Sequence, residues 1–181
     1  ETIGCSDALY EVDPYTDEGI EVAEITTVLL SESATAKEAV ELLLSIYDSV
    51  GAAGGSGIFI ADDKEVWYVE NASGTQYVAV KLTSTMAFSQ PNMSVIGLID
   101  LDDTENVMAS ANLIAVAEQA GSYVGDKEAN TIDYAASYNA DQGVGSRMVN
   151  ALKYFNAATA KEEPDYADFA ISNVAADGSI V

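Results

Sequence analysis

Apolar residues recur at helical spacing between positions 35 and 50 of the chain. Thr35 opens this stretch and Glu38 follows three residues later, which is the spacing of a capping box at a helix N-terminus. Polar residues occupy the opposite face, so the pattern predicts a helix with one buried side. That side is formed by Ala36, Ala39, Val40, Leu43, Ile46, Tyr47 and Val50. A shorter apolar-periodic stretch predicts another helix over Glu21–Leu30.

Short apolar runs replace the helical spacing after the glycine-rich segment Gly51–Gly57. This segment lacks the lysine of a Walker loop and the spacing of a dinucleotide-binding loop, so we interpret it as a helix-to-strand connection. The turns that follow are so short that neighbouring strands must pair antiparallel. Bulky residues flank Trp67 on both faces of its strand, which predicts a strand buried inside a layered domain. The four predicted strands are Ile58–Ala61, Glu65–Glu70, Gln76–Lys81 and Thr85–Phe88.

The pattern is weaker in the remainder of the chain. Helices are predicted over Val107–Gln119 and roughly over positions 146–155. Positions 1–20, 123–145 and 162–181 show no clear helix or strand period. Because no repeat or long linker divides the sequence, we predict a single α+β domain over all 181 residues, with antiparallel strands packed against helices.

Composition narrows the possible partners. Hydrophobic residues make up 49% of the chain, which is enough to build a core, but 30 acidic residues face only 7 basic ones. The resulting net charge of -23 repels nucleic acid and anionic lipid, because binding to either depends on lysine and arginine. No apolar run reaches the roughly 18 residues of a membrane span. We therefore expect neither a nucleic-acid partner nor membrane insertion, and the sequence assigns no compartment.

The sequence offers little for metal or nucleophilic chemistry. It contains no histidine and one cysteine, Cys5, whose sequence neighbours include no basic side chain. A thiol needs such a neighbour to become a reactive thiolate, so we interpret Cys5 as passive. The acidic run Asp100–Asp103 begins like a calcium loop, but Glu105 stands where that loop requires glycine. We predict no metal and no cofactor.

Two polar residues stand at positions where function is conceivable. Asn92 follows the fourth predicted strand, where a side-chain amide can either donate to an oxyanion or cap a turn. Arg147 is the only arginine and opens the last predicted helix, where a cation is unfavourable to the helix dipole. It can be a surface charge or can hold a carboxylate. The residues alone leave both alternatives open.

In their order along the chain, several stretches resemble a dipeptidase family of the N-terminal-nucleophile hydrolases. This family is cysteine peptidase family 69, formerly unassigned peptidase family 34. The block DKEVWYVE with TQYVAVKL carries the most specific part of the resemblance. Further matching stretches are ETIGCSDALYEVDP, GIEVAEITTVLL, ATAKEAVELLLSIYDSVGAAGGSGIFIADDKEVWYVENASGTQYVAVKL, SQPNMSVIGLIDLDD, ANLIAVAEQAG and GSRMVNALKYFN.

The resemblance implies a four-layer αββα sandwich like that of penicillin V acylases and bile-salt hydrolases. In this scheme an N-terminal cysteine, exposed by processing, attacks an amide carbonyl and its own free amine serves as the base. No histidine is needed. By the same resemblance, Asn92 matches the asparagine that supports the oxyanion, and Arg147 matches the arginine near the nucleophile.

The family nucleophile has no match in this sequence. Cys5 lies inside the ETI segment, so we expect the nucleophile in a segment that precedes Glu1, and the family's C-terminal helices beyond Val181. The chain starts without Met, and we expect it to be the interior portion of a larger hydrolase domain and inactive by itself.

The complete enzyme would hydrolyse a dipeptide or another small amide. The partial sandwich would have open strand edges, so we also expect a homo-oligomer. The alternatives are a non-catalytic acidic binding or surface-interaction domain, and a degenerate remnant of an enzyme.

Overall fold

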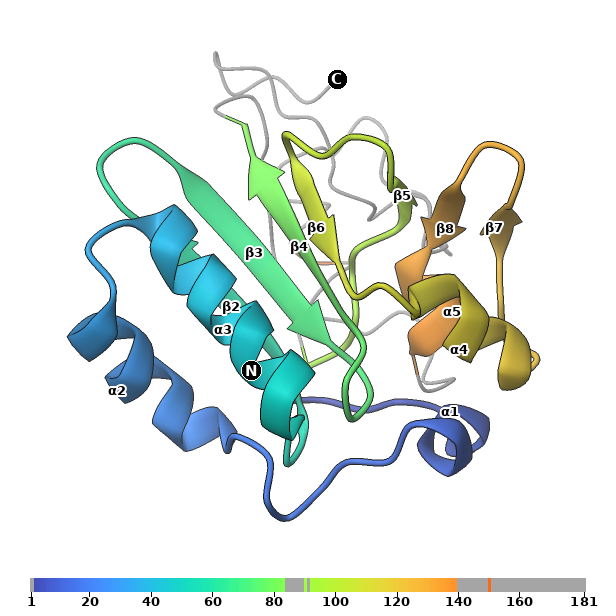
Figure 1. The fold of residues 1–181 in the computed structure, drawn as a ribbon. Coiled ribbons are helices and arrows are strands. Elements are labelled where there is room, and N and C mark those ends of the chain that lie inside the picture. The colour runs from blue at the N-terminus through green and yellow to red at the C-terminus, as the bar shows by residue number, and fades with distance from the viewer. Residues whose placement is uncertain (1, 84–89, 91, 140–149, 151–181) are drawn as a thin grey trace.

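The structure is a computed structural model that describes residues 2–83, 90, 92–139 and 150. It combines helices with two antiparallel sheets, which confirms the α+β class (Figure 1). The helices are α1 (Asp7–Val12), α2 (Val22–Glu32), α3 (Ala36–Val50), α4 (Leu113–Gln119) and α5 (Tyr134–Tyr138). One sheet has the order β1 (Thr2–Ile3), β2 (Gly55–Ala61), β3 (Val66–Asn71), β4 (Tyr77–Leu82) and β6 (Val107–Ala109). The other has the order β5 (Leu98–Asp100), β8 (Thr131–Asp133) and β7 (Gly125–Asp126).

Both helices predicted in the first third of the chain are confirmed. Thr35 caps α3, with its hydroxyl accepting a hydrogen bond from the backbone N–H of Glu38 at 3.2 Å. The Glu38 carboxylate in turn accepts the N–H of Ala34, one residue earlier than a capping box requires. The predicted buried side holds except at its end, where Val50 is 49% exposed. Val50 lies in the last turn, where Gly51 ends the helix with a positive φ of 77°.

The central hairpins are confirmed as well. β2, β3 and β4 pair antiparallel through the two predicted short turns. On β3, Trp67 and Tyr68 point to opposite faces of the sheet and both are buried, so the prediction of a strand covered on both sides is correct. The strand predicted at Thr85–Phe88 lies outside the described residues.

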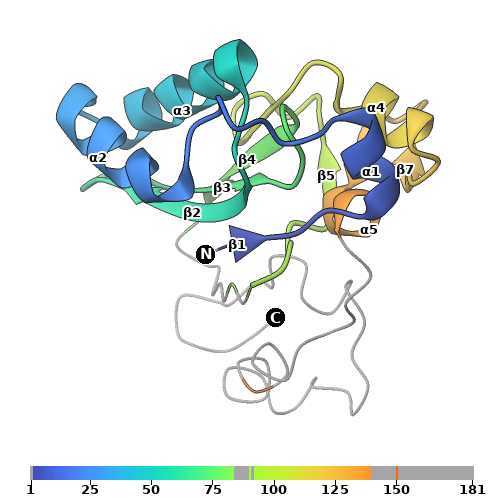
Figure 2. The ribbon, with the colours of Figure 1, turned by 90° about the horizontal axis from the view of Figure 1, so that it is seen from below.

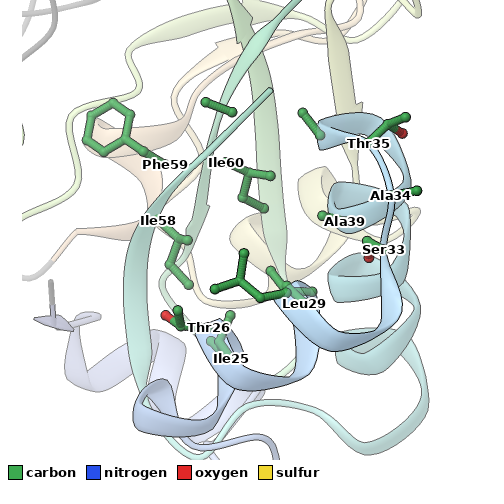
Figure 3. Close-up of a pocket in the computed structure, with 13 residues that line it drawn as sticks. Ile25, Thr26, Leu29, Ser33, Ala34, Thr35, Ala39, Ile58, Phe59 and Ile60 are labelled. Atoms are coloured by element: carbon green, nitrogen blue, oxygen red, sulfur yellow. The ribbon is translucent and has the colours of Figure 1, made fainter. Parts of the chain in front are cut away.

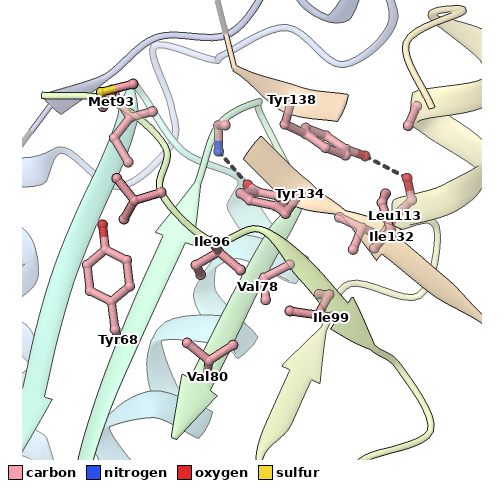
Figure 4. Packing of buried hydrophobic residues seen from close by; sticks show 14 of the residues in the cluster. Tyr68, Val78, Val80, Met93, Ile96, Ile99, Leu113, Ile132, Tyr134 and Tyr138 are labelled. Carbon is pink, nitrogen blue, oxygen red and sulfur yellow. Dashed lines mark hydrogen bonds between the residues drawn. The ribbon is translucent and has the colours of Figure 1, made fainter. Parts of the chain in front are cut away.

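Each face of the central sheet carries its own hydrophobic core (Figures 1 and 2). The helix-side core joins α2 and α3 to one face of the sheet, and Figure 2 shows both helices on the same side of β2 and β3. Its main members are Ile25, Leu29, Val40, Leu43, Tyr47, Trp67, Val69 and Ala79. The loop-side core joins the other face to segment 93–97, the second sheet and the helices α1, α4 and α5 (Figure 4). Its main members are Leu9, Tyr68, Val78, Val80, Ile96, Ile99, Leu113, Ile132, Tyr134 and Tyr138.

The expected connection Gly51–Gly57 is shorter than predicted, because its last three residues already belong to β2. Three further sequence predictions are wrong, all in elements of the loop-side core. Positions 107–119 were expected to form one helix, but Val107–Ala109 pairs with β4 and only Leu113–Gln119 is helical. Segment 123–145 was expected to be irregular, yet it contains β7, β8 and α5. Segment 1–20 holds β1 and α1, whose Leu9 is fully buried. In each case a few tertiary contacts fix an element that is too short to show a period.

The turn between β3 and β4 is held by a residue far away in sequence. The Asp13 carboxylate accepts hydrogen bonds from the Ser73 hydroxyl at 2.7 Å, the Thr75 N–H at 2.7 Å and the Thr75 hydroxyl at 2.9 Å. The backbone carbonyl of Asp13 accepts the N–H of Gly74 at 2.9 Å. A Cβ at Gly74 would collide with the carbonyl of Pro14, so glycine allows the two segments to approach this closely.

Candidate functional site

A buried carboxylate joins β3 to segment 93–97, which directly follows Asn92 in the chain. Glu70 lies on the loop-side face of β3 and is fully buried. Its Oε1 accepts the Tyr68 hydroxyl at 2.8 Å and the Val95 N–H at 2.8 Å. Its Oε2 accepts the Ser94 hydroxyl at 2.9 Å and, more weakly, the Ile96 N–H at 3.4 Å. Four donors therefore converge on one carboxyl group.

Burial and hydrogen bonding act in opposite directions on Glu70. Burial raises the pKa of its carboxyl group from 4.5 to about 7, because the apolar surroundings disfavour the charged form. The donors from Val95, Tyr68, Ser94 and Ile96 favour the charged form and limit the rise. The group therefore titrates near neutral pH, with its charged form held by N–H and O–H groups.

Segment 93–97 has no regular secondary structure but is buried throughout. Its backbone is also bonded on the side away from Glu70. The carbonyl of Ile96 accepts the Ala135 N–H at 2.7 Å, and the carbonyl of Gly97 accepts the Tyr134 N–H at 3.0 Å. Tyr134 also reaches the central sheet, since its hydroxyl accepts the N–H of Ala72 at 2.9 Å (Figure 4). The segment is thus held between β3 and the start of α5.

Asn92 lies at the surface, directly before this buried segment. Two residues earlier, the Gln90 side chain lies over Gly57 of β2. A Cβ at Gly57 would collide with the Tyr68 hydroxyl and lie only 2.9 Å from Nε2 of Gln90. Gly57 is also the register partner of Glu70. The exposed amide therefore stands between two stretches of chain that both contact the same part of the central sheet.

Arg147 lies outside the described residues, as does the predicted helix over 146–155 apart from residue 150. The structure places Asn92 and leaves its spatial relation to Arg147 a prediction. Glu70 was missed by the sequence interpretation, although a signal existed. Glu70 is a carboxylate in a strand that is expected to be buried on both faces. A buried carboxylate requires hydrogen-bond donors nearby, so its presence there indicates a specific contact.

Cys5 lies in surroundings that keep its thiol protonated. It forms an isolated β-bridge with Asn139 and packs at the border of the loop-side core. Burial raises the pKa of the Cys5 thiol, and the carboxylates of Asp13 and Asp7 raise it further. A reactive cysteine needs the opposite environment, one that lowers the thiol pKa.

An apolar groove of about 320 Å³ lies between α2 and β2 (Figure 3). Its wall includes Ile25, Leu29, Ile58, Phe59 and Ile60, and the described residues that line it carry no titratable side chain. The groove can therefore hold an apolar group, and its polar side chains are the hydroxyls of Thr26, Ser33 and Thr35. Within the described ranges, no three acidic or cysteine side chains are grouped so as to hold a metal ion. None of the helices in the same ranges has the length and apolar character needed to cross a bilayer.

Comparison with known proteins agrees with the resemblance seen in the sequence. The model of peptidase family C69 matches residues 1–167. A protein of Streptococcus pyogenes serotype M1 named Probable dipeptidase B is 38% identical over 118 residues, which cover 65% of this chain and 24% of that protein. A protein of Salmonella dublin named Probable dipeptidase is 34% identical over 142 residues, which cover 78% of this chain and 32% of that protein.

The matched region thus spans about a quarter to a third of the length of these relatives. The family model extends from the first residue of the chain into the region beyond Arg147. The chain belongs to peptidase family C69.

Proposed function

We propose that the chain is an interior portion of a dipeptidase, which hydrolyses dipeptides or similar small amides through an N-terminal cysteine in a preceding segment. The observation that carries this proposal is the match of the family model to residues 1–167. The names of the relatives support the activity, and their greater length supports the presence of further chain. The described sheet would be one β layer of the αββα sandwich, with α2 and α3 as its outer helical layer.

In the proposed mechanism, the thiol of the N-terminal cysteine attacks the amide carbonyl while the free amine of the same residue takes its proton. The carbonyl oxygen becomes an oxyanion, which accepts a hydrogen bond from the side-chain amide of Asn92. Collapse of this intermediate breaks the C–N bond, the proton passes to the leaving amine, and a thioester remains. Water then hydrolyses the thioester. The exposure of Asn92 supports this role, because a substrate can reach its amide.

Arg147 would lie beside the thiol. A guanidinium group stays charged at all relevant pH values, so it can favour the thiolate or hold the substrate carboxylate. Cys5 has no part in this scheme, which is supported by the raised pKa of its thiol.

The experiment that tests the proposal uses the complete protein, including the segment before Glu1. We expect hydrolysis of dipeptides that is lost when the N-terminal cysteine is replaced and unchanged in Cys5→Ala. Arg147→Ala should lower kcat while the free energy of unfolding changes little. The 181 residues alone should hydrolyse nothing. Activity that survives replacement of the N-terminal cysteine, or that depends on Cys5, would contradict the proposal.

The same proposal predicts self-association of the isolated chain. β1 covers β2 only at Ser56 and Gly55, so most of the outer edge of β2 has no described partner strand. Leu30 and Phe59 stand exposed beside it, at 79% and 49%. Open edges and apolar surface favour pairing with a second copy. Light scattering should show a dimer or larger species, and a stable monomer at high concentration would refute this point.

A further inference from the structure

We propose that Glu70 is a positioning residue of the active site, whose carboxylate holds segment 93–97 so that the preceding Asn92 is presented at a fixed place. This inference rests on the proposed function of Asn92. It concerns a residue that neither the sequence interpretation nor the proposed mechanism uses.

A buried backbone N–H without a partner is costly, so buried irregular segments require dedicated acceptors. Val95 and Ile96 are 2% and 0% exposed, and β5 begins only at Leu98, after both of them. Glu70 supplies the acceptors for their two N–H groups and for the Ser94 hydroxyl. One side chain on β3 thus fixes three consecutive residues that lie 24 to 26 positions further along the chain.

The carboxylate is suited to this task because it has two oxygens and no hydrogen to donate. Four donors point at it, two at each oxygen. A glutamine of the same size would offer one oxygen and an NH2 group, which cannot accept the donors on its side. Glu70→Gln therefore removes half of the acceptors while leaving the volume of the side chain unchanged.

Position matters for Asn92 because an oxyanion donor acts only when it is held where the charge develops. Supporting residues must hold such groups within about 0.5 Å of the productive geometry. Asn92 is exposed at the surface. The chain is anchored on both sides of it, where Gln90 lies over Gly57 and Ser94 donates a hydrogen bond to Glu70. Gly57 and Glu70 are paired across β2 and β3, so both anchors share one rigid base.

The test compares Glu70→Gln and Asn92→Ala, singly and together, in the complete protein. Glu70→Gln should lower kcat about 10-fold or more while KM stays within about twofold, because misplacement of a catalytic group affects the transition state. In the Asn92→Ala background the same substitution should lower kcat by less than about twofold, since nothing is left to position. A control variant, Tyr47→Phe, removes a buried hydroxyl of the helix-side core, which bonds Asn71 and Ser56, and should leave kcat unchanged.

Two results would overturn the inference. One is an unchanged kcat in Glu70→Gln, and the other is an equal loss in the presence and absence of Asn92. If Glu70→Gln does not fold, Ser94→Ala removes one donor and should show the same pattern with a loss of about threefold.

Amide hydrogen exchange separates a failure of the inference from a failure of the proposed function. Exchange at Val95 and Ile96 should accelerate in Glu70→Gln, while exchange at Ala79 in the ladder between β3 and β4 stays unchanged. If the complete wild-type protein cleaves no dipeptide, the proposed function fails whatever Glu70 does. If it cleaves dipeptides but exchange at Val95 and Ile96 is unaffected, the role of Glu70 fails alone.

Discussion

The two faces of the central sheet are stabilised in different ways. On the helix side, long regular helices cover the sheet with aliphatic and aromatic side chains such as Leu43 and Trp67. On the loop side, short elements and an irregular segment cover it, and a buried carboxyl group with four donors lies among the apolar residues. The first face is built to be stable. The loop-side face is less stable than it could be, because burying the Glu70 carboxyl group is unfavourable. The same group fixes the shape of segment 93–97.

The largest expected effect lies on the helix side. Leu43 is fully buried in α3, so Leu43→Ala should lower the free energy of unfolding by about 2–5 kcal/mol through lost burial and the cavity it leaves. Chemical denaturation measures this change. In the complete protein kcat should stay within about twofold, because the cavity lies on the face away from Glu70. A loss of kcat as large as that of Glu70→Gln would show that the two faces do not act separately.

On the loop side, the titration of Glu70 should change the free energy of unfolding by about 3 kcal/mol. The pKa of its carboxyl group is about 7 in the folded state against 4.5 in the unfolded state. Below pH 4.5 the Glu70 carboxyl is protonated in both the folded and the unfolded state, so the cost of burying its charge is absent and stability is at its highest with respect to this group. Between pH 4.5 and 7 the unfolded chain releases the proton while the folded chain retains it, so stability falls. Above pH 7 the loss is complete.

Chemical denaturation of the wild type and of Glu70→Gln between pH 4.5 and 7 isolates the contribution of Glu70 to the free energy of unfolding, since all other carboxylates are common to both proteins. The wild type should lose stability relative to the variant as pH rises from 4.5 to 7. Two tyrosines face Glu70, namely Tyr68 and Tyr134. Burial and the nearby Glu70 carboxylate raise the pKa of Tyr134 well above 10, so Tyr134 does not titrate in this range, and the Tyr68 hydroxyl donates a hydrogen bond to Glu70. A constant difference between the two proteins would show that Glu70 does not titrate there.

The smallest expected effect is again on the helix side, at the start of α3. Thr35→Ala removes the acceptor for the Glu38 N–H and should cost about 1 kcal/mol. Thr35→Ser keeps a hydroxyl and should recover most of this loss. Thermal denaturation of the three proteins distinguishes them. Equal stability of the alanine and serine variants would show that the hydroxyl at position 35 does not stabilise α3.

The same division explains what the sequence could predict. α3, β3 and β4 are long enough to show their period and are predicted to within one residue at each end. The end of β2 is predicted as well, but its start at Gly55 lies in the glycine-rich segment, which shows no strand period. β6 carries apolar residues that fit either a helix or a strand, and its pairing with Val78–Val80 of β4 decides the outcome. Three of the four donors to Glu70 come from a segment more than twenty residues away, which no local pattern reveals. Asn92 and Arg147 were chosen by resemblance, and their joint placement stays a prediction.

The contact between Asp13 and the turn at Ser73–Thr75 has a practical consequence for shortening the protein. The hairpin of β3 and β4 has a complete ladder of its own, but its loop relies on acceptors contributed by a residue about sixty positions upstream. Trimming the N-terminal segment past Asp13 would therefore leave the Thr75 N–H and two hydroxyls to bind water, and would loosen the closed end of the hairpin. Any minimal version should retain Asp13 and Pro14.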